Sequence, residues 1–179
     1  GLYHFLTQLG HAVQVISPTN WAAFLDWMPG SRTVLDYEKF KDKSEESLRQ
    51  AEWIFCLDFN TLSRTKRMAS SLQQSTAVKI LIDHHREPEV TAFAYGVSDI
   101  SKSSTCEMVY DFIKGSGRMD LLNLSMMQCL YAGVMGDTGS FRFSSASATV
   151  HEMVAEFKHR GLEHTIVHEQ IYDNFLENR

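Results

Sequence analysis

Three short apolar segments in the first half of the chain constrain its fold most strongly. They span 12–16, 53–57 and 78–82, and the last two run Trp-Ile-Phe-Cys-Leu and Val-Lys-Ile-Leu-Ile. A helix-compatible stretch at 62–74 separates these two. Near-continuous apolar strands that alternate with helices are typical of a parallel sheet covered on both faces. We therefore predict an α/β fold, a parallel sheet flanked by helices.

The second half of the chain is predicted to be helical. Ser103-Ser104-Thr105 followed by Glu107 is typical of a helix N-cap with an acidic partner, and that helix should end near Gly115. Apolar residues recur at helical spacing in the other helical segments. The remaining expected elements are an opening helix at 2–9 capped by Gly10, a loop with a surface helix at 36–50, a strand at 92–97, and helices at 123–135, 146–160 and 163–177.

The composition narrows the class of protein. Hydrophobic residues make up 44% and charged residues 22%, which is enough for a sizeable core and a soluble surface. No apolar run approaches the ~20 residues that cross a bilayer, and no signal-peptide pattern opens the sequence. The three cysteines lack CxxC spacing, so we expect reduced thiols and a cytoplasmic protein without a membrane partner. A net charge of −5 argues against tight binding of duplex DNA.

Polar, metal-competent residues directly follow two of the predicted strands. Asp58 comes after 53–57, and Asp83-His84-His85 comes after 78–82. The carboxyl ends of parallel strands share one edge of a sheet, where ligands bind, so both groups point to one site. Carboxylate and imidazole ligands without thiolate suit manganese, iron, magnesium or zinc. The structural alternative for Asp58 is a turn or helix N-cap acceptor.

A third polar group follows the predicted helix at 123–135. It runs Gly136-Asp137-Thr138-Gly139 and continues to Ser140-Phe141-Arg142-Phe143. Asp137 should lie just past the helix C-terminus, whose partial negative charge favours a bound cation. Arg142 is predicted to bind substrate through a phosphate oxygen, which its planar fork matches. The alternative is a glycine-rich helix exit with Asp137 as a solvated turn residue.

These motifs, in this order and spacing, resemble the DHH phosphoesterase family. The Ser103–Glu107 helix start further resembles its bacterial oligoribonuclease and phosphoadenosine-phosphate phosphatase branch, which is related to exopolyphosphatases. The resemblance implies hydrolysis of short oligoribonucleotides or small nucleotides such as phosphoadenosine phosphate. It also implies two divalent ions, Mn²⁺ or alternatively Mg²⁺, with attack on phosphorus by a metal-bound hydroxide.

The same resemblance implies roles for individual residues. Asp58 would bridge the two ions, His84 would ligate one of them, and Asp137 would complete the coordination. Asp83 would orient the neighbouring imidazole without touching the metal. His85 would contact the scissile phosphate, as both a catalytic and a substrate-binding residue. The predicted metal ligands are therefore Asp58, His84 and Asp137.

The family pattern also includes segments that this sequence lacks. Its first metal motif, a His followed by two Asp residues, belongs on a strand before the opening helix, and its C-terminal substrate-binding domain belongs after residue 179. We predict a catalytic domain at 1–160 and a connector helix at 161–179. This exact chain should bind metals poorly and have little activity.

Several functional alternatives stay open at this point. The expected partner is a small nucleotide or short single-stranded RNA, and a homodimer is compatible with the sequence. An exopolyphosphatase or pyrophosphatase would use the same metal centre on a different substrate. A non-catalytic nucleotide-binding domain would keep only part of the metal centre.

Overall fold

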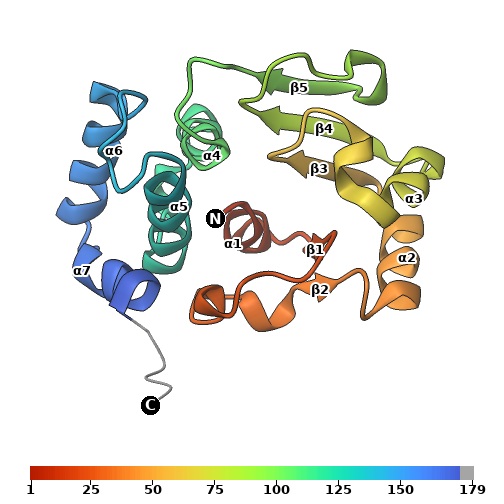
Figure 1. Cartoon of the computed structure of the whole chain (residues 1–179), viewed down its shortest axis with the longest axis horizontal. Helices are drawn as coiled ribbons and strands as arrows, with labels where there is room; N and C mark the ends of the chain where they lie inside the picture. The colour runs from red at the N-terminus through yellow and green to blue at the C-terminus, as the bar shows by residue number, and fades with distance from the viewer. Residues whose placement is uncertain (174–179) are drawn as a thin grey trace.

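The computed structural model describes residues 1–173, whose strands form two parallel sheets (Figure 1). β1 (Ile16–Ser17) pairs with β2 (Leu35–Asp36). β3 (Trp53–Leu57), β4 (Val78–Asp83) and β5 (Tyr95–Ser98) form a three-stranded sheet in that order. Both pairings in the larger sheet are parallel. The prediction of an α/β fold with parallel strands is confirmed.

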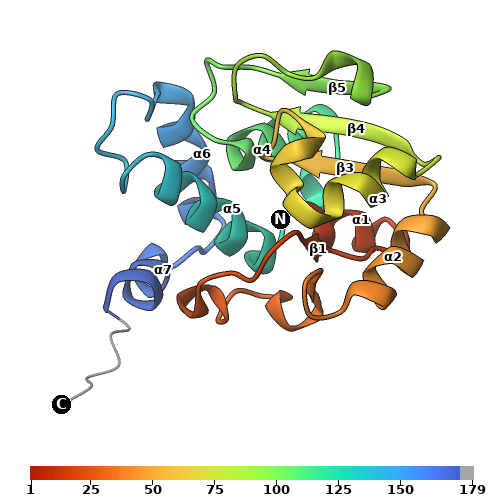
Figure 2. The ribbon, with the colours of Figure 1, turned by 45° about the vertical axis from the view of Figure 1, so that its right-hand side comes forward.

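Helices connect the strands and form most of the C-terminal half. They are α1 (Leu2–Gln8), α2 (Lys41–Gln50), α3 (Ala69–Gln74), α4 (Thr105–Gly115), α5 (Leu124–Asp137), α6 (Ala148–His159) and α7 (His164–His168). The arrowheads of β3, β4 and β5 point toward the side where α4, α5 and α6 lie (Figure 1), and the turned view agrees (Figure 2). The carboxyl ends of the strands therefore face the later helices.

Two helix boundaries follow the sequence closely. After α1, Gly10 has φ +90°, its N–H bonds the Thr7 carbonyl, and the His11 N–H bonds the Leu6 carbonyl. This paired arrangement is the Schellman motif, and it requires a left-handed residue that glycine adopts easily. At the start of α4, Ser104 Oγ accepts a hydrogen bond of 3.0 Å from the Glu107 N–H. The predicted cap and the predicted end of this helix are both confirmed.

Other boundaries were predicted wrongly. The expected strand at 12–16 is reduced to β1, because β2 pairs only with Ile16 and Ser17, although the Leu35 N–H also bonds the Val15 carbonyl at 2.9 Å. The expected helix at 62–74 is a 3₁₀ segment, Leu62–Met68, followed by α3. Lys66, with φ +54° and ψ −119°, breaks the continuity between them. The expected strand at 92–97 begins only at Tyr95, after a 3₁₀ turn at Val90–Ala92.

The covering of the sheet is also less complete than expected. β5 is an edge strand whose residues are all exposed, with Tyr95 at 65% and Val97 at 59%.

At the other end of the chain, the expected helix at 163–177 is the short α7 and a π turn at Glu169–Asp173. Residues 174–177 of that expected helix lie outside the described residues.

The main core lies among the later helices. Val109 and Ile113 of α4, Met126 and Leu130 of α5, and Phe157 of α6 are almost fully buried in it. A smaller cluster, Tyr37, Leu48, Leu62, Met68 and Leu72, packs beside α2 and α3. All three cysteines are free. Within residues 1–173, no helix has the length and apolar character required to cross a membrane.

Candidate metal centre

Asp58 lies immediately after β3 in a left-handed backbone conformation, with φ +66°. Such a φ is uncommon for residues other than glycine, although aspartate tolerates it better than most. Its N–H bonds the Ile82 carbonyl of β4 at 3.2 Å, so the turn extends the sheet. No helix begins at Asp58, since the next helical turn starts at Leu62 with Thr61 as its N-cap. The N-cap interpretation of Asp58 is therefore wrong.

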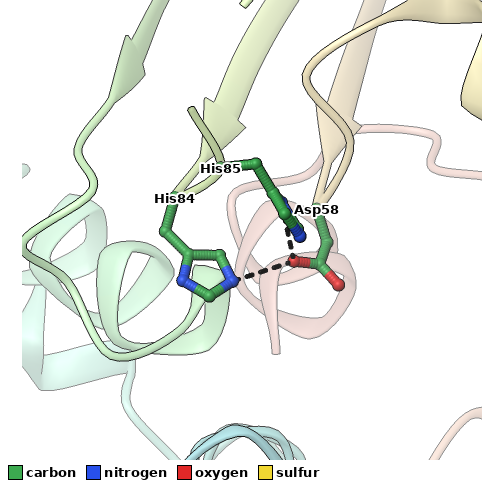
Figure 3. A group of neighbouring side chains, drawn as sticks. All are labelled: Asp58, His84 and His85. Carbon is green, nitrogen blue, oxygen red and sulfur yellow. Dashed lines mark ion pairs between the residues drawn. The ribbon is translucent and has the colours of Figure 1, made fainter. Parts of the chain in front are cut away.

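The two histidines after β4 turn toward the same oxygen of Asp58 (Figure 3). His84 Nε2 lies 3.5 Å from Asp58 Oδ1, and His85 Nδ1 lies 4.0 Å from it. The two ring centroids are 4.8 Å apart. One ligand atom from each of the three residues lies within 4.8 Å of the others. Two neighbouring strand ends thus bring Asp58, His84 and His85 together, as the sequence predicted.

Each imidazole is held by a hydrogen bond at Nδ1. His84 Nδ1 lies 3.3 Å from the Lys102 carbonyl. Because a carbonyl only accepts, Nδ1 is the donor in this bond, and Nε2 is directed toward Asp58 Oδ1. His85 Nδ1 bonds Asp83 Oδ1 at 2.8 Å, and the His85 N–H bonds Asp83 Oδ2 at 2.9 Å. Asp83 is fully buried. Metal-binding histidines typically have such partners, which fix the ring and its tautomer.

Asp137 is the last residue of α5, with Thr138 as the C-cap, so it does not lie past the helix as predicted. The helix continues because the Thr138 N–H still bonds the Val134 carbonyl at 3.0 Å. Although the residue is exposed overall, partial burial of the carboxyl group raises the pKa of Asp137. The charge of Asp58 raises this pKa further, whereas His84 and His85 lower it. The structure groups the ligand atoms of Asp58, His84 and His85 within 4.8 Å of one another, and Asp137 is not a member of this group.

Known proteins are similar to this chain in sequence and in fold. Residues 1–134 match a family model described as the N-terminal domain of the DHH family. The chain belongs to the DHH family. The matched residues include Asp58 and Asp83-His84-His85 and end before Asp137. The DHH family is a family of phosphoesterases, and the family assignment is thereby confirmed.

Two relatives of the DHH family chain differ from it in length. The bifunctional oligoribonuclease and PAP phosphatase NrnA of Bacillus subtilis is 28% identical over 112 residues, which are 62% of this chain and 36% of that protein. An exopolyphosphatase-related protein from Bacteroides fragilis is 33% identical, with a TM-score of 0.95. The match covers 98% of this chain and 52% of the Bacteroides chain. This chain thus spans about half the length, or less, of these relatives.

The donors at this site fit a divalent ion. Ligand bonds of about 2.1 Å place two donors on one ion roughly 3 Å apart, close to the 3.5 Å between Asp58 Oδ1 and His84 Nε2. One carboxylate and two imidazoles without thiolate match the metals expected from the sequence. The three residues Asp58, His84 and His85 therefore form a group whose donors could hold a metal ion.

Arg142 lies in the loop after α5, where its side chain bonds to the backbone. It is exposed, and its Nε donates to the Gly139 carbonyl at 2.7 Å. In the part of the chain that the structure describes, no hydrogen bond or ion pair joins Arg142 to the three donors. Its contact with phosphate stays a prediction.

Sequence reasoning missed two groups that contact the site. Thr105 Oγ1 donates to Asp58 Oδ1 at 3.0 Å. The Lys102 carbonyl accepts a hydrogen bond from His84 Nδ1. The N-cap pattern at Ser103–Glu107 identified this segment as a helix start. It did not identify the site that the helix start faces.

We expect the Asp137→Asn variant to be more stable than the wild type at pH 7 when both are free of metal. A carboxyl group with a raised pKa binds its proton more tightly in the folded state. Stability therefore falls as pH rises from the ordinary value of 3.8 through the raised one. The loss is absent well below pH 3.8 and grows as pH rises through the raised pKa of Asp137. Urea unfolding of the wild type and of Asp137→Asn, with a chelator present, at pH 7 and at a pH below 3.8 measures the difference in their free energy of unfolding. Equal stability of the two proteins at pH 7 would contradict the prediction.

Proposed function

We propose that this chain carries the metal centre of a phosphoesterase acting on short oligoribonucleotides or small nucleotides such as phosphoadenosine phosphate. The observation that supports it is the convergence of Asp58, His84 and His85 at the carboxyl ends of β3 and β4. The substrate class comes from the printed activity of the NrnA relative, which is 28% identical over its aligned part.

In this proposal, Asp58, His84 and Asp137 would contribute ligands to two divalent ions, Mn²⁺ or alternatively Mg²⁺. When bound, such ions lower the pKa of water and stabilise charge on phosphate oxygens. Asp58 matters most, because its Oδ1 lies beside both imidazoles. His85 contributes differently, since Asp83 holds its Nδ1 and leaves Nε2 free for a phosphate oxygen. The protein residues thus orient the ligands and the substrate.

We also propose that residues 1–160 are the catalytic domain and that 161–179 connect it to a substrate-binding domain. Helix α6 ends at His159, and a turn separates it from α7. Limited proteolysis of the protein at its natural length should cut first between residue 160 and the following domain. Protection of that segment would contradict this boundary.

The test of the function is a side-by-side assay of the protein at its natural length. A short RNA, phosphoadenosine phosphate and a cyclic dinucleotide are incubated with Mn²⁺ or with a chelator. We expect Mn²⁺-dependent release of nucleoside monophosphate from RNA and of phosphate from phosphoadenosine phosphate. Bound nucleotide without turnover would favour a non-catalytic nucleotide-binding domain.

A second candidate is hydrolysis of polyphosphate or pyrophosphate. It is favoured by the relative from Bacteroides fragilis, which is described as exopolyphosphatase-related and shares the fold at a TM-score of 0.95. Phosphate release from polyphosphate in the same assay separates the two candidates. Faster turnover of polyphosphate than of either nucleotide substrate would reject the nucleotide proposal.

A further inference from the structure

The segment between β5 and α4 contacts two of the proposed metal ligands. The Lys102 carbonyl accepts the hydrogen bond from His84 Nδ1. Three residues later, Thr105 Oγ1 donates to Asp58 Oδ1. Movement of this segment would therefore change both the tautomer preference of His84 and the orientation of Asp58.

Glu107 holds that segment in place through its side chain. Its Oε2 accepts from the Ser103 N–H at 2.8 Å and from Ser103 Oγ at 2.7 Å. Its Oε1 accepts from Lys102 Nζ at 3.1 Å. The residue is only 3% exposed, so these bonds form with little competition from water. Capping of α4 does not depend on its carboxylate alone, because Ser104 Oγ also caps the helix.

The charge state of Glu107 agrees with this role. Burial raises the pKa of Glu107, but the hydrogen bonds from Ser103 and Lys102 outweigh it, and the net pKa is lowered. The carboxylate is therefore ionised at neutral pH and accepts from these three donors, and its Oε1 also accepts from Thr149 Oγ1 of α6 at 3.4 Å. Lys102 Nζ is held on its other side by Asp111 Oδ2 at 2.6 Å.

We propose that Glu107 is a positioning residue for His84. By fixing Lys102 and Ser103, it keeps the Lys102 carbonyl against Nδ1 and so directs Nε2 of His84 toward Asp58. This inference rests on the proposed function, because His84 is a metal ligand in that proposal. The tautomer itself is a property of the protein without metal or substrate.

The test uses the Glu107→Gln variant of the protein at its natural length. Nitrogen NMR of the ring, with the signal assigned by His84→Gln, reports the tautomer in the metal-free protein. We expect Nδ1 of wild-type His84 to carry a proton that is hydrogen-bonded to the Lys102 carbonyl, and we expect E107Q to lose this bond in part of the molecules. Calorimetry should show Mn²⁺ affinity lowered by up to about 10-fold, because losing a group that bonds a metal ligand directly costs about 10- to 100-fold and Glu107 acts one contact further away.

The matched control is Glu152→Gln, which removes the same charge from an exposed site on α6. It should leave both the tautomer and the Mn²⁺ affinity unchanged. If E107Q does not fold, Ser103→Ala removes only the bond from Ser103 Oγ and should shift the tautomer in the same direction by less.

An E107Q or S103A protein with an unchanged His84 tautomer would overturn the proposal, even if its melting temperature fell. Such a result would leave Glu107 a purely structural residue. The two proposals can fail separately. If the wild-type protein has no hydrolytic activity but E107Q still changes the state of His84, the proposed function is contradicted and the positioning role of Glu107 is supported.

Discussion

The Asp58→Ala variant is expected to lose Mn²⁺-dependent hydrolysis almost completely, with turnover lowered about a thousandfold or more. Asp58 Oδ1 is the atom nearest to both histidines, at 3.5 and 4.0 Å. A metal contributes several kcal/mol of charge stabilisation, and about 1.4 kcal/mol corresponds to a tenfold change in rate. Initial rates on the best substrate, measured over a range of Mn²⁺ concentrations, give the effect.

Two further variants separate the carboxylate from the backbone. Alanine is strained at the φ of +66°, whereas asparagine tolerates the left-handed region, so Asp58→Asn removes the charge with less effect on the turn. Asp120→Ala makes the same substitution at an exposed carboxylate paired with Arg118 and should leave turnover unchanged. Near-normal turnover by a folded Asp58→Asn protein would reject the proposed role of Asp58.

The Gly133→Ala variant is expected to destabilise the fold, by about 1–2 kcal/mol. Gly133 of α5 faces Cys106 of α4, and an added Cβ would lie 2.2 Å from Sγ and 3.0 Å from Cβ of that cysteine. Overpacking of a core typically costs about 1–3 kcal/mol, and the better helix propensity of alanine offsets up to about 1 kcal/mol. Urea unfolding of the metal-free protein measures the change.

Helix α5 contains its own control for this substitution. A Cβ at Gly136 meets nothing within 4 Å, so Gly136→Ala should be neutral or slightly stabilising. Adding Cys106→Ala to Gly133→Ala removes the closest atom and should recover part of the lost stability. If Gly133→Ala and Gly136→Ala are equally stable, the close contact between α4 and α5 is wrong.

The effect of Gly133→Ala should extend to the metal centre. Thr105 at the start of α4 contacts Asp58, and Asp137 at the end of α5 is within electrostatic reach of the same carboxylate. Forcing these helices apart should therefore lower Mn²⁺ affinity as well as stability. The same calorimetry that tests Glu107 measures this effect.

The sequence predicted the strands that build the site better than any other part. The runs at 53–57 and 78–82 became β3 and β4, because each combines β-branched or aromatic residues with an abrupt polar end. The N-cap serine fixed the start of α4 for a similarly local reason. Local chemistry was sufficient in these places.

The prediction failed where a segment depends on a distant partner. Residues 12–15 have the apolar pattern of a strand, but β2 pairs only with Ile16 and Ser17. The end of α5 was placed too early, because glycine near the C-terminus suggested an exit that the Thr138-to-Val134 hydrogen bond postpones. Neither outcome follows from the local residues alone.

The sequence by itself determined which ligand types reach one edge of the sheet, since Asp58 and His84 directly follow parallel strands. Only the tertiary structure decided which nitrogen of His84 faces Asp58 and which hydroxyl donates to that carboxylate. The Lys102 carbonyl and Thr105 lie 18 and 47 residues from their partners. Hydrogen bonds over such separations depend on where the β5–α4 connection passes in space, and no local pattern encodes that path.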